Sequence, residues 1–272
     1  MPLIQYLPAG LDEQSSLLLK AALSMAEKAG DIHLKYFRDD NLSQETKLND
    51  SDVVTIADKE SEKEIIDYIH IHFPDHGIIS EESGKENEER EWRWVIDPLD
   101  GTTNFSSGLP VFCVSIALEH NSEAILGVVH APYLNETFFA VKDKGAFFKG
   151  IPIHCSDKNS LSKAVVATGV PYDRKENPDN NLPEINRMAF YVRGIRRMGS
   201  AAIDLSYTAA GFFDAYWELN LNRWDVAAGL LIAKEAGALA MSIRDDRNYS
   251  LLVSNPFLFH EIKNILLTSP ER

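Results

Sequence analysis

The chain has 272 residues, of which 44% are hydrophobic and 25% are charged, and its formal net charge at pH 7 is −14. This length and composition predict a globular protein with one large domain or two lobes, and no stretch is long and apolar enough to cross a membrane. The negative charge makes nucleic acid an unfavourable partner, because its phosphates would be repelled, so any phosphate ligand has to be held by local cations.

The location is predicted from the N-terminal residues and the cysteines. Residues 1–5 lack the basic and apolar regions of a signal peptide. Cys113 lies in an apolar, strand-like run and Cys155 lies in a polar connection, so a disulfide framework is not expected. We therefore expect a cytoplasmic protein with reduced cysteines.

Two helices are predicted in the first part of the chain. Apolar residues spaced by three and four over positions 18–36 indicate an amphipathic helix that ends before the polar residues 38–41. A second helix is predicted over residues 57–73 and ends at a Pro-Asp-His-Gly sequence. The side chains of this helix that we expect to face inward are Ile65, Ile66 and Ile69.

Two short apolar strands follow, and each delivers an acidic residue. Residues 77–80 form a strand directly before Glu81, and residues 94–96 form a strand directly before Asp97. The charged residues 85–91 between them are expected to be a solvated connection.

A sharp turn is predicted after the second strand. Pro98 has no amide hydrogen for a strand ladder and disfavours a helical residue before it, so we expect the strand to stop there. The turn then presents Asp100, and Gly101 permits close approach of the backbone. Thr102 and Thr103 are both able to cap a following helix whose free amides face an anion.

The rest of the chain alternates strands and helices. Turn residues divide positions 111–148 into an antiparallel meander, and further strands are predicted over 164–168 and 212–218, with a polar loop over 172–181. The predicted helices cover residues 182–192, 201–210 and 224–236. This alternation indicates a layered α/β or α+β architecture, and no linker requires a division of the chain.

Acidic residues in these positions indicate a site for Mg²⁺, which prefers carboxylate and carbonyl oxygens. Asp97, Asp100 and the carbonyl of Leu99 supply such oxygens from one turn, and Glu81 adds a carboxylate from the neighbouring strand. Asp225 lies at the start of the last predicted helix, where it either complements the helix dipole or completes the metal site from the C-terminal half.

Crowded carboxylates require a counter-charge. Each like-charged pair 4 Å apart costs about 4 kcal/mol at an effective dielectric constant near 20. Two or more divalent ions would reverse this repulsion, and metals roughly 3.5–4 Å apart are able to hold both the attacking and the leaving oxygen of a displacement. The number of acids therefore favours a multi-metal phosphatase.

Four segments of the chain resemble motifs of one protein family. Residues 95–105 and 222–229 are similar to the two signatures of the inositol monophosphatase family. Residues 79–83 resemble its upstream acidic motif, and residues 53–58 resemble the segment that carries an aspartate supporting the catalytic threonine. The resemblance extends from the first helix almost to the C-terminus, with the motifs in the expected order.

The resemblance implies roles for residues at the matching positions. Two or three Mg²⁺ ions would be held by Glu81, Asp97, the carbonyl of Leu99, Asp100 and Asp225. Thr102, paired with Asp58, would orient and activate the attacking water, Glu81 would also be catalytic, and Glu82 would assist indirectly. The substrate would be contacted by Glu81, Leu99, Asp100, Gly101, Thr102, Gly199, Ser200, Ala201, Glu218 and Asp225. Lys47 falls where the family has a lysine near a peripheral metal.

The chain departs from the family pattern after Gly237. The family has a second glycine there and a glycine-rich turn further on, whereas this chain has Ala238 and the polar residues 244–248. We expect these residues to form a strand and hairpin away from the metals, so the departure affects the turn rather than catalysis.

The resemblance implies a Mg²⁺-dependent phosphomonoesterase that hydrolyses myo-inositol 1-phosphate, with substrate choice set around Ser200, Glu218 and the loop 172–181. The implied fold is the layered α/β sandwich of sugar phosphatases, with alternating helix and sheet layers, commonly in a homodimer. Residues 1–272 would form a single domain, with an N-terminal lobe over about 1–150 that holds the metal site and a C-terminal lobe over about 151–272 that completes it.

Several alternatives stay open. Relatives of this family hydrolyse fructose 1,6-bisphosphate, histidinol phosphate or 3′-phosphoadenosine 5′-phosphate, and the last group carries Lys-Glu where this chain has Thr103-Asn104. A regulatory binding protein on the same fold is the alternative from another class. The basic cluster of Arg193, Arg196 and Arg197 would serve such a role, although a structural ion-pair role near the substrate is favoured. His70, His72 and His76 are interpreted as surface residues rather than as a zinc site.

Overall fold

A computed structural model defines residues 2–39, 44–46 and 53–268 of the chain. Its α-helices are α1 (Glu13–Tyr36), α2 (Ile56–His72), α3 (Thr102–Ser106), α4 (Leu182–Met188), α5 (Ala201–Ala209), α6 (Arg223–Glu235) and α7 (Phe259–Leu267). Two short 3₁₀ helices are η1 (Leu3–Tyr6) and η2 (Leu161–Lys163). None of the helices in the defined part of the chain is long and apolar enough to span a membrane.

The strands form two large sheets and one small ribbon. The eight-stranded sheet contains β3 (Gly77–Ser80), β4 (Gly84–Glu86), β5 (Trp92–Asp100), β6 (Cys113–His120), β7 (Glu123–Ala131), β8 (Glu136–Val141), β9 (Ala146–Phe148) and β10 (Ile151–Ile153). The five-stranded sheet contains β11 (Val165–Thr168), β12 (Gly194–Arg196), β13 (Ala215–Leu221), β14 (Leu239–Ser242) and β15 (Tyr249–Ser254). The ribbon pairs β1 (Gln44–Thr46) with β2 (Val53–Thr55).

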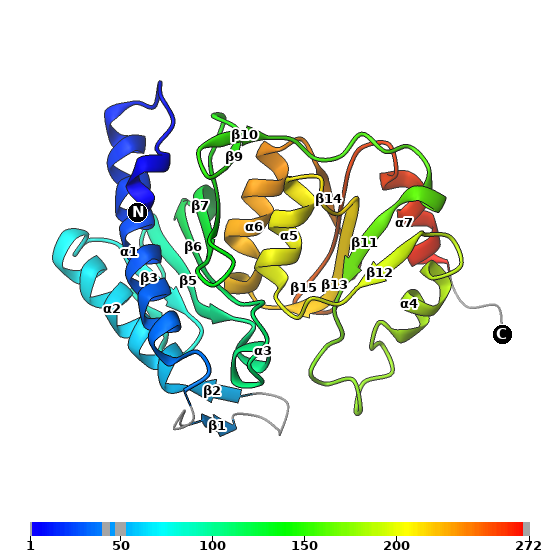
Figure 1. Cartoon of the computed structure of the whole chain (residues 1–272), viewed down its shortest axis with the longest axis horizontal. Helices are drawn as coiled ribbons and strands as arrows, with labels where there is room; N and C mark the ends of the chain where they lie inside the picture. Colours follow the sequence, from blue (N-terminus) through cyan, green and yellow to red (C-terminus); the bar gives the residue numbers. More distant parts are fainter. Residues whose placement is uncertain (1, 40–43, 47–52, 269–272) are drawn as a thin grey trace.

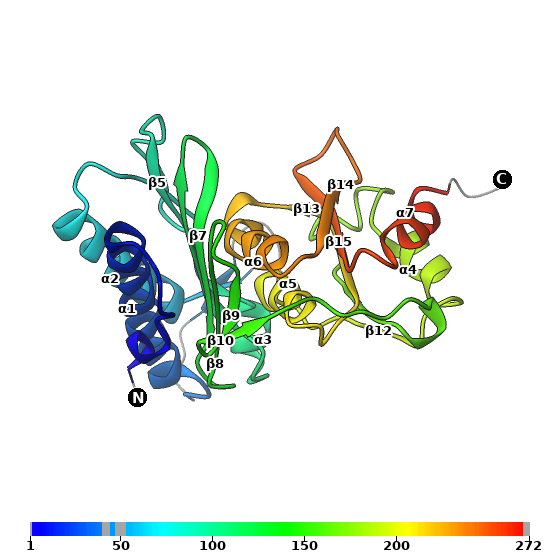
Figure 2. The same cartoon turned by 90° about the horizontal axis from the view of Figure 1, so that it is seen from above.

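Helices and sheets alternate in five layers, as Figure 1 shows from one side and Figure 2 from above. Helices α1 and α2 cover the outer face of the eight-stranded sheet, α5 and α6 fill the space between the two sheets, and α4 and α7 cover the outer face of the five-stranded sheet. The layered α/β sandwich with alternating helix and sheet layers, predicted from the sequence, is confirmed.

The strand order places two sets of carboxyl ends where a site can form. In the eight-stranded sheet, in the order β10-β9-β8-β7-β6-β5-β3-β4, only β3 and β5 are parallel neighbours, with Ser80 opposite Ile96. In the five-stranded sheet, in the order β12-β11-β13-β15-β14, β11 runs parallel to β13, with Thr168 opposite Trp217. Residues that follow parallel neighbours lie at one edge of the sheet, which explains how distant segments meet.

Amphipathic patterning produces the three main apolar clusters. The outer cluster of the N-terminal half joins α1 and α2 to the eight-stranded sheet and includes the buried Leu19, Ile65 and Trp94. The central cluster packs α5 and α6 between the sheets, and the third packs α4 and α7 against the five-stranded sheet. The predicted inward positions Ile65 and Ile69 are fully buried, whereas Ile66 is only partly buried.

The strand that delivers Asp97 does not end at Pro98. Strand β5 continues to Asp100, and its pairing with β6 shifts register between Asp97 and Asp100. A bulge of this kind accommodates a residue that lacks an amide hydrogen, because the ladder bond it cannot make is skipped. The prediction of a strand end at Pro98 was therefore wrong, and the turn begins only after Asp100, at Gly101.

Other boundaries also differ from the sequence predictions. The strand predicted over 212–218 is β13, which starts later, because residues 211–214 form a turn whose buried Asp214 accepts hydrogen bonds from Ser156, Lys158 and the amide of Val165. Helix α4 ends at Met188 rather than at residue 192. The connection predicted over 85–91 contains the end of strand β4. Helix α7 and strand β12 were not predicted, whereas the hairpin of β14 and β15 was.

Candidate functional site

The acidic residues predicted to share a site come from three elements. Glu81 directly follows β3, and Asp97 and Asp100 lie at the end of the parallel neighbour β5. Asp225 lies in the first turn of α6, which packs against β5 and β6 from the layer between the sheets. The fold thus brings together segments that are more than a hundred positions apart in the sequence.

The electrostatics of these acids show that they lie close together. Burial raises the pKa of Asp97 well above its usual range, and the charges of Glu81, Asp100 and Asp225 raise it further. Burial and the charges of Asp100 and Glu81 likewise raise the pKa of Asp225. Burial raises the pKa of Asp100 to about 6, against the lowering effect of its hydrogen bond from Ser200. Carboxylates in this state favour either protons or cations.

Hydrogen bonds from the protein fix one oxygen of several of these acids. The amide of Leu99 donates to Asp97 Oδ1 at 3.1 Å. Asp100 Oδ2 accepts from Ser200 Oγ at 2.6 Å and from the amide of Ala202 at 2.7 Å. Asp225 Oδ2 accepts from the amide of Asn222 at 2.6 Å in a capping box at the start of α6. The carboxylate orientations are therefore set by the backbone.

The donor set suits a hard divalent cation, since it consists of carboxylate and carbonyl oxygens. Within the residues that the structure defines, no three His, Cys, Asp or Glu side chains form a ready-made coordination shell. Lys47, predicted near a peripheral metal, lies outside the defined residues.

Glu62 supports the turn that carries Glu81, a role that the sequence did not reveal. Its buried carboxylate accepts hydrogen bonds from Ser80 Oγ and from the amides of Glu82 at 3.1 Å and Ser83 at 3.0 Å. Glu62 lies four residues after Asp58 on α2, so both acids face the site from the same side of the helix. The spacing of four residues between Asp58 and Glu62 was the feature of the sequence that could have indicated this role.

Thr102 and Asp58 form the predicted pair. Thr102 Oγ1 lies 2.9 Å from Asp58 Oδ1 and also 2.9 Å from the carbonyl oxygen of Leu99. Asp58 Oδ2 accepts from the amide of Thr55 at 2.8 Å and from Thr55 Oγ1 at 2.6 Å, so a capping box at the start of α2 orients the carboxylate. Burial raises the pKa of Asp58 to about 6, although these hydrogen bonds oppose the rise.

The prediction that Thr102 and Thr103 cap the next helix was wrong. The N-cap of α3 is Gly101, in the left-handed region with φ of 96°, and no side-chain hydrogen bond caps this helix. A Cβ at Gly101 would lie 2.9 Å from the carbonyl oxygen of Val111, so glycine is required for both conformation and space. The Thr102 hydroxyl is engaged by Asp58 and Leu99 instead.

A cavity of about 770 Å³ opens beside these acids. The site residues predicted from the sequence that line this cavity are Glu81, Asp100, Gly199, Ser200, Ala201, Glu218 and Asp225. The predicted site residues that do not line it are Asp58, Asp97, Leu99, Gly101 and Thr102, which are neighbours of Asp100 in the chain or are hydrogen-bonded to Thr102. Tyr172, Asp173 and Glu176 from the predicted polar loop form part of the opposite wall. The cavity therefore has an acidic end and a mixed polar end.

Glu218 is held at the polar end by residues that the sequence did not indicate. Tyr216 donates its hydroxyl to Glu218 Oε2 at 2.6 Å. Burial raises the pKa of Glu218 to about 7, against the hydrogen bond from Tyr216 and the charge of Arg197. A Cβ added at Gly169 would overlap the Glu218 carboxylate, so the absence of a side chain there makes room for it.

The close ion pairs expected for the arginine cluster are not formed in the defined part of the chain, although the charge of Arg197 acts on Glu218. Among the defined residues, no ion pair includes Arg193, Arg196 or Arg197. Arg197 instead lines the cavity, where it is the one Lys or Arg in the defined lining. His70 forms an exposed pair with Glu86 at 3.2 Å, and His76 stacks against Trp92.

The chain matches the family model of the inositol monophosphatase family over residues 14–266. It is 41% identical over 253 residues to the Nus factor SuhB of Pasteurella multocida, covering 91% of this chain and 94% of that protein. It is also 41% identical over 225 residues to the inositol-1-monophosphatase of a Synechocystis species, covering 81% and 78% of the two chains. Among solved structures, the inositol monophosphatase from Anabaena superposes with a TM-score of 0.84 at 37% identity, over 93% of this chain and 96% of that chain.

Proposed function

Because the chain belongs to the inositol monophosphatase family and is thus a phosphomonoester hydrolase, we propose that it hydrolyses myo-inositol 1-phosphate or a closely related polyol monophosphate with the aid of Mg²⁺. Two or three ions would be held by Glu81, Asp97, the carbonyl of Leu99, Asp100 and Asp225. When bound, the ions would offset the repulsion among the carboxylates, bind the phosphate oxygens and make water more acidic.

Thr102 and Asp58 would position the attacking water. The Thr102 hydroxyl has one proton and two acceptors within 2.9 Å, so donation to Asp58 leaves the Leu99 carbonyl available to a cation. In that arrangement a lone pair of Thr102 Oγ1 accepts a hydrogen bond from the attacking water and so orients the water oxygen toward phosphorus. The bond between the water oxygen and phosphorus would form as the bond between phosphorus and the alcohol oxygen breaks. The water loses one proton in this step and the departing alcohol oxygen takes one up, so the protons balance.

The two ends of the cavity would bind the two halves of the substrate. The amides of Gly101 and Thr102 begin helix α3 and have no acceptor within the helix, so they are suited to phosphate oxygens. The alcohol would extend past Gly199, Ser200 and Ala201 toward Glu218, whose carboxyl group is able to accept a hydroxyl hydrogen bond.

One observation carries this proposal: acids from distant segments lie together beside a cavity and the Thr102–Asp58 pair, and burial and the charges of the neighbouring acids raise the pKa of Asp97 and of Asp225. Phosphate release from myo-inositol 1-phosphate in Mg²⁺ tests it. Asp97→Asn is expected to lower kcat by about 100-fold or more, on the scale of losing one electrostatic stabiliser, and to leave the fold intact. Asp75→Asn, at an exposed surface position, is the matched control.

Two outcomes would count against this assignment. Near-normal turnover by the Asp97→Asn variant would show that the acidic site takes no part in the reaction. Continued hydrolysis in excess EDTA would show that the reaction needs no divalent cation. A panel containing fructose 1,6-bisphosphate, histidinol phosphate and 3′-phosphoadenosine 5′-phosphate identifies the substrate among the family alternatives by comparison of kcat/KM.

A regulatory binding role is the second candidate, favoured by the similarity to a protein named a Nus factor and by the exposed Arg193 and Arg196. Capture of a defined partner by Asp97→Asn, lost in an Arg193→Ala/Arg196→Ala double variant, would support it.

We further propose a cytoplasmic homodimer, which light scattering would detect as twice the 30.5 kDa of one chain.

A further inference from the structure

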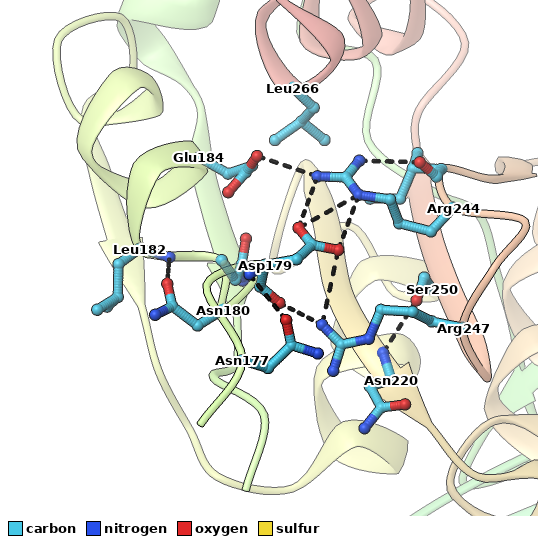
Figure 3. A network of polar contacts seen from close by, with 12 residues as sticks. Asn177, Asp179, Asn180, Leu182, Glu184, Asn220, Arg244, Arg247, Ser250 and Leu266 are labelled. Carbon is cyan, nitrogen blue, oxygen red and sulfur yellow. Dashed lines mark hydrogen bonds and ion pairs between the residues drawn. The ribbon is translucent and has the colours of Figure 1, made fainter. Parts of the chain in front are cut away.

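A network of charged side chains joins the loop 172–181 and the start of α4 to the hairpin of β14 and β15, as Figure 3 shows for Asp179, Glu184, Arg244 and Arg247. Arg244 and Arg247 lie in the turn between these strands, and their partners lie in the loop 172–181 and at the start of α4. The network occupies the region where the chain departs from the glycine-rich turn of its family. We call Arg244 and Arg247 the arginine clamp.

Arg247 binds the loop at two points. Its side chain is 9% exposed, and its Nη2 donates to Asp173 Oδ1 at 3.0 Å and Oδ2 at 2.8 Å. Its Nη1 donates to the carbonyl oxygen of Asp179. A planar guanidinium that contacts a carboxylate and a carbonyl fixes both the distance and the orientation of the segment between them.

Arg244 binds the same loop from further along the hairpin. Its Nε lies 3.1 Å from Asp179 Oδ2, and its Nη2 lies 3.1 Å from Asp179 Oδ1 and from Glu184 Oε1. Asp179 is therefore held through its carboxylate by Arg244 and through its carbonyl by Arg247. Glu184 extends the network into α4.

The loop depends on these contacts because it has no regular secondary structure. Its end is attached to the sheet by the buried Asn181, which donates to Thr168 Oγ1 at 2.8 Å and to the carbonyl of Gly169 at 2.6 Å and accepts from Trp217 Nε1 at 2.7 Å. Among the defined residues from Pro171 to Asn181, the ion pairs that join the loop to another element are those with Arg244 and Arg247.

The clamped segment is also a wall of the cavity. Tyr172, Asp173 and Glu176 line it from the loop, and Asn248, next to Arg247, lines it from the hairpin. The Arg247–Asp173 pair therefore joins two parts of the lining of the cavity that also contains Glu218. The acidic end, by contrast, is built from β3, β5 and α6, which the clamp does not touch.

We propose that Arg244 and Arg247 are positioning residues that hold the loop 172–181 as the alcohol-binding wall and so set selectivity for the alcohol half of the substrate. This inference rests on the proposed function, since it assigns the polar end of the cavity to the alcohol. It separates two properties of the enzyme: the acidic end performs hydrolysis, and the clamp determines which esters reach it in a productive orientation.

The test compares two substrates in the full-length protein with Mg²⁺. Myo-inositol 1-phosphate reaches the wall, whereas methyl phosphate has no alcohol group large enough to touch it. Arg247→Ala is expected to lower kcat/KM for myo-inositol 1-phosphate by about tenfold, mainly through KM, which is the scale of losing one well-placed binding contact. For methyl phosphate, kcat/KM is expected to change by less than about twofold.

Hydrogen exchange supplies a readout that does not depend on activity. The amides of Glu176 and Asn177 donate to the carbonyl of Asp173, and the amide of Asp179 donates to Asn177 Oδ1. Arg247→Ala is expected to speed exchange at these amides and to leave α5 and α6 unchanged. Arg247→Lys, which keeps the charge without the planar fork, is the milder variant, with effects in the same direction.

Arg187→Ala is the matched control. Arg187 lies in the same lobe and also contacts Glu184, but its other bonds go to the carbonyls of Ile265 and Leu266 in α7 rather than to the loop. It is expected to leave both the loop exchange and the ratio of the two kcat/KM values unchanged.

The outcomes separate this inference from the proposed function. If the wild type releases no phosphate from either ester, the proposed function fails and this inference fails with it. If the wild type is active but Arg247→Ala leaves loop exchange unchanged, or speeds exchange without altering the substrate ratio, the clamp proposal alone is overturned. Equal losses on both esters would also overturn it.

Discussion

Thr102 illustrates how one hydroxyl can link two parts of the site. It lies 2.9 Å from both Asp58 Oδ1 and the Leu99 carbonyl, and it has only one proton to donate. The buried Asp58 is oriented by Thr55, so the acceptor position is fixed before any ligand arrives. The position of the Thr102 proton therefore determines whether the Leu99 carbonyl is available to a cation.

Thr102→Ala is expected to lower kcat by about 10²–10⁴-fold, the range for a positioned proton-transfer group, with a much smaller change in KM. Thr102→Ser keeps the hydroxyl and is expected to retain most of the activity. Steady-state kinetics on both variants check this. An alanine variant as active as the serine variant would show that the hydroxyl has no part in the reaction.

Gly169 is expected to control the position of Glu218. Because a Cβ at this position would overlap the Glu218 carboxylate, Gly169→Ala should displace that group and raise KM for a polyol phosphate by about tenfold, with kcat changed little. The KM and kcat of the variant are measured separately. A fall in kcat with unchanged KM would contradict a role for Gly169 in alcohol binding.

The pKa of Asp58 predicts a pH dependence of stability. Its folded value of about 6 lies above the ordinary 3.8, so the folded state binds the proton more tightly than the unfolded state. Its contribution to stability is therefore favourable at low pH and decreases as the pH rises from about 4 through 6. In EDTA, the free energy of unfolding of the wild type should fall relative to that of Asp58→Asn over this range.

Urea unfolding of both proteins at several pH values from 4.5 to 7.5 measures this difference. A constant difference would mean that Asp58 titrates alike in both states. A wild type that gains stability relative to the variant as pH rises would reverse the sign and contradict the burial argument.

At the level of single residues, sequence patterns identified acids that follow strands but not the residues that support them. Glu81, Asp97 and Asp100 were recognisable because short apolar runs precede them. Gly169 and the clamp arginines act through partners that are distant in the chain, so no local pattern marks them. Glu62 also acts on distant partners, and its spacing of four residues from Asp58 on α2 was the one local signal for it. Asp225 was ambiguous because its capping role and its predicted metal role use the same position, and the structure shows the capping box directly.

The element that presents Asp225 is anchored by a buried ion pair. Arg223, the first residue of α6, donates from Nε to Glu119 Oε1 at 2.7 Å and from Nη2 to Glu119 Oε2 at 2.5 Å, and Arg93 contacts the same carboxylate at 3.3 Å. Glu119 lies on β6, so the pair ties the start of α6 to the eight-stranded sheet. The helix start is thereby fixed relative to β5.

Glu119→Gln is expected to lower the free energy of unfolding by about 3 kcal/mol, because it leaves two partly buried arginines without their counter-charge. Glu64→Gln breaks the exposed pair with Lys28 and should change the free energy of unfolding by less than about 0.5 kcal/mol. Urea unfolding measures both. Equal effects of the two substitutions would show that the Glu119 pair is not a structural anchor.

At the level of elements, periodicity predicted what was regular and missed what depends on tertiary context. Helices α1 and α2 and the meander β6–β9 have clear apolar spacing and were predicted. Strand β5 passes Pro98 because a bulge in its pairing with β6 skips the missing donor, which cannot be read from β5 alone. Strand β13 starts later than its apolar run because Asp214 is used to hold the preceding turn.

For the whole molecule, the five-layer arrangement explains why the site has two distinct ends. The eight-stranded sheet supplies Glu81, Asp97 and Asp100, and the five-stranded sheet with its loop and hairpin supplies the polar wall. Helices α5 and α6 lie between the sheets (Figure 2). Ser200 is the N-cap of α5, and Asp225 lies in the first turn of α6. A layered fold was predictable from the alternation of elements, whereas the cavity between the sheets depends on packing that the sequence pattern does not encode.

Diffraction from crystals grown with Mn²⁺ and phosphate tests the central claim, because the anomalous signal of Mn²⁺ locates each ion independently of the protein model. We predict at least two anomalous peaks within about 2.5 Å of carboxylate oxygens of Glu81, Asp97, Asp100 and Asp225, with phosphate beside Gly101 and Thr102. Peaks confined to other parts of the molecule, with these four side chains directed away from one another, would contradict the account.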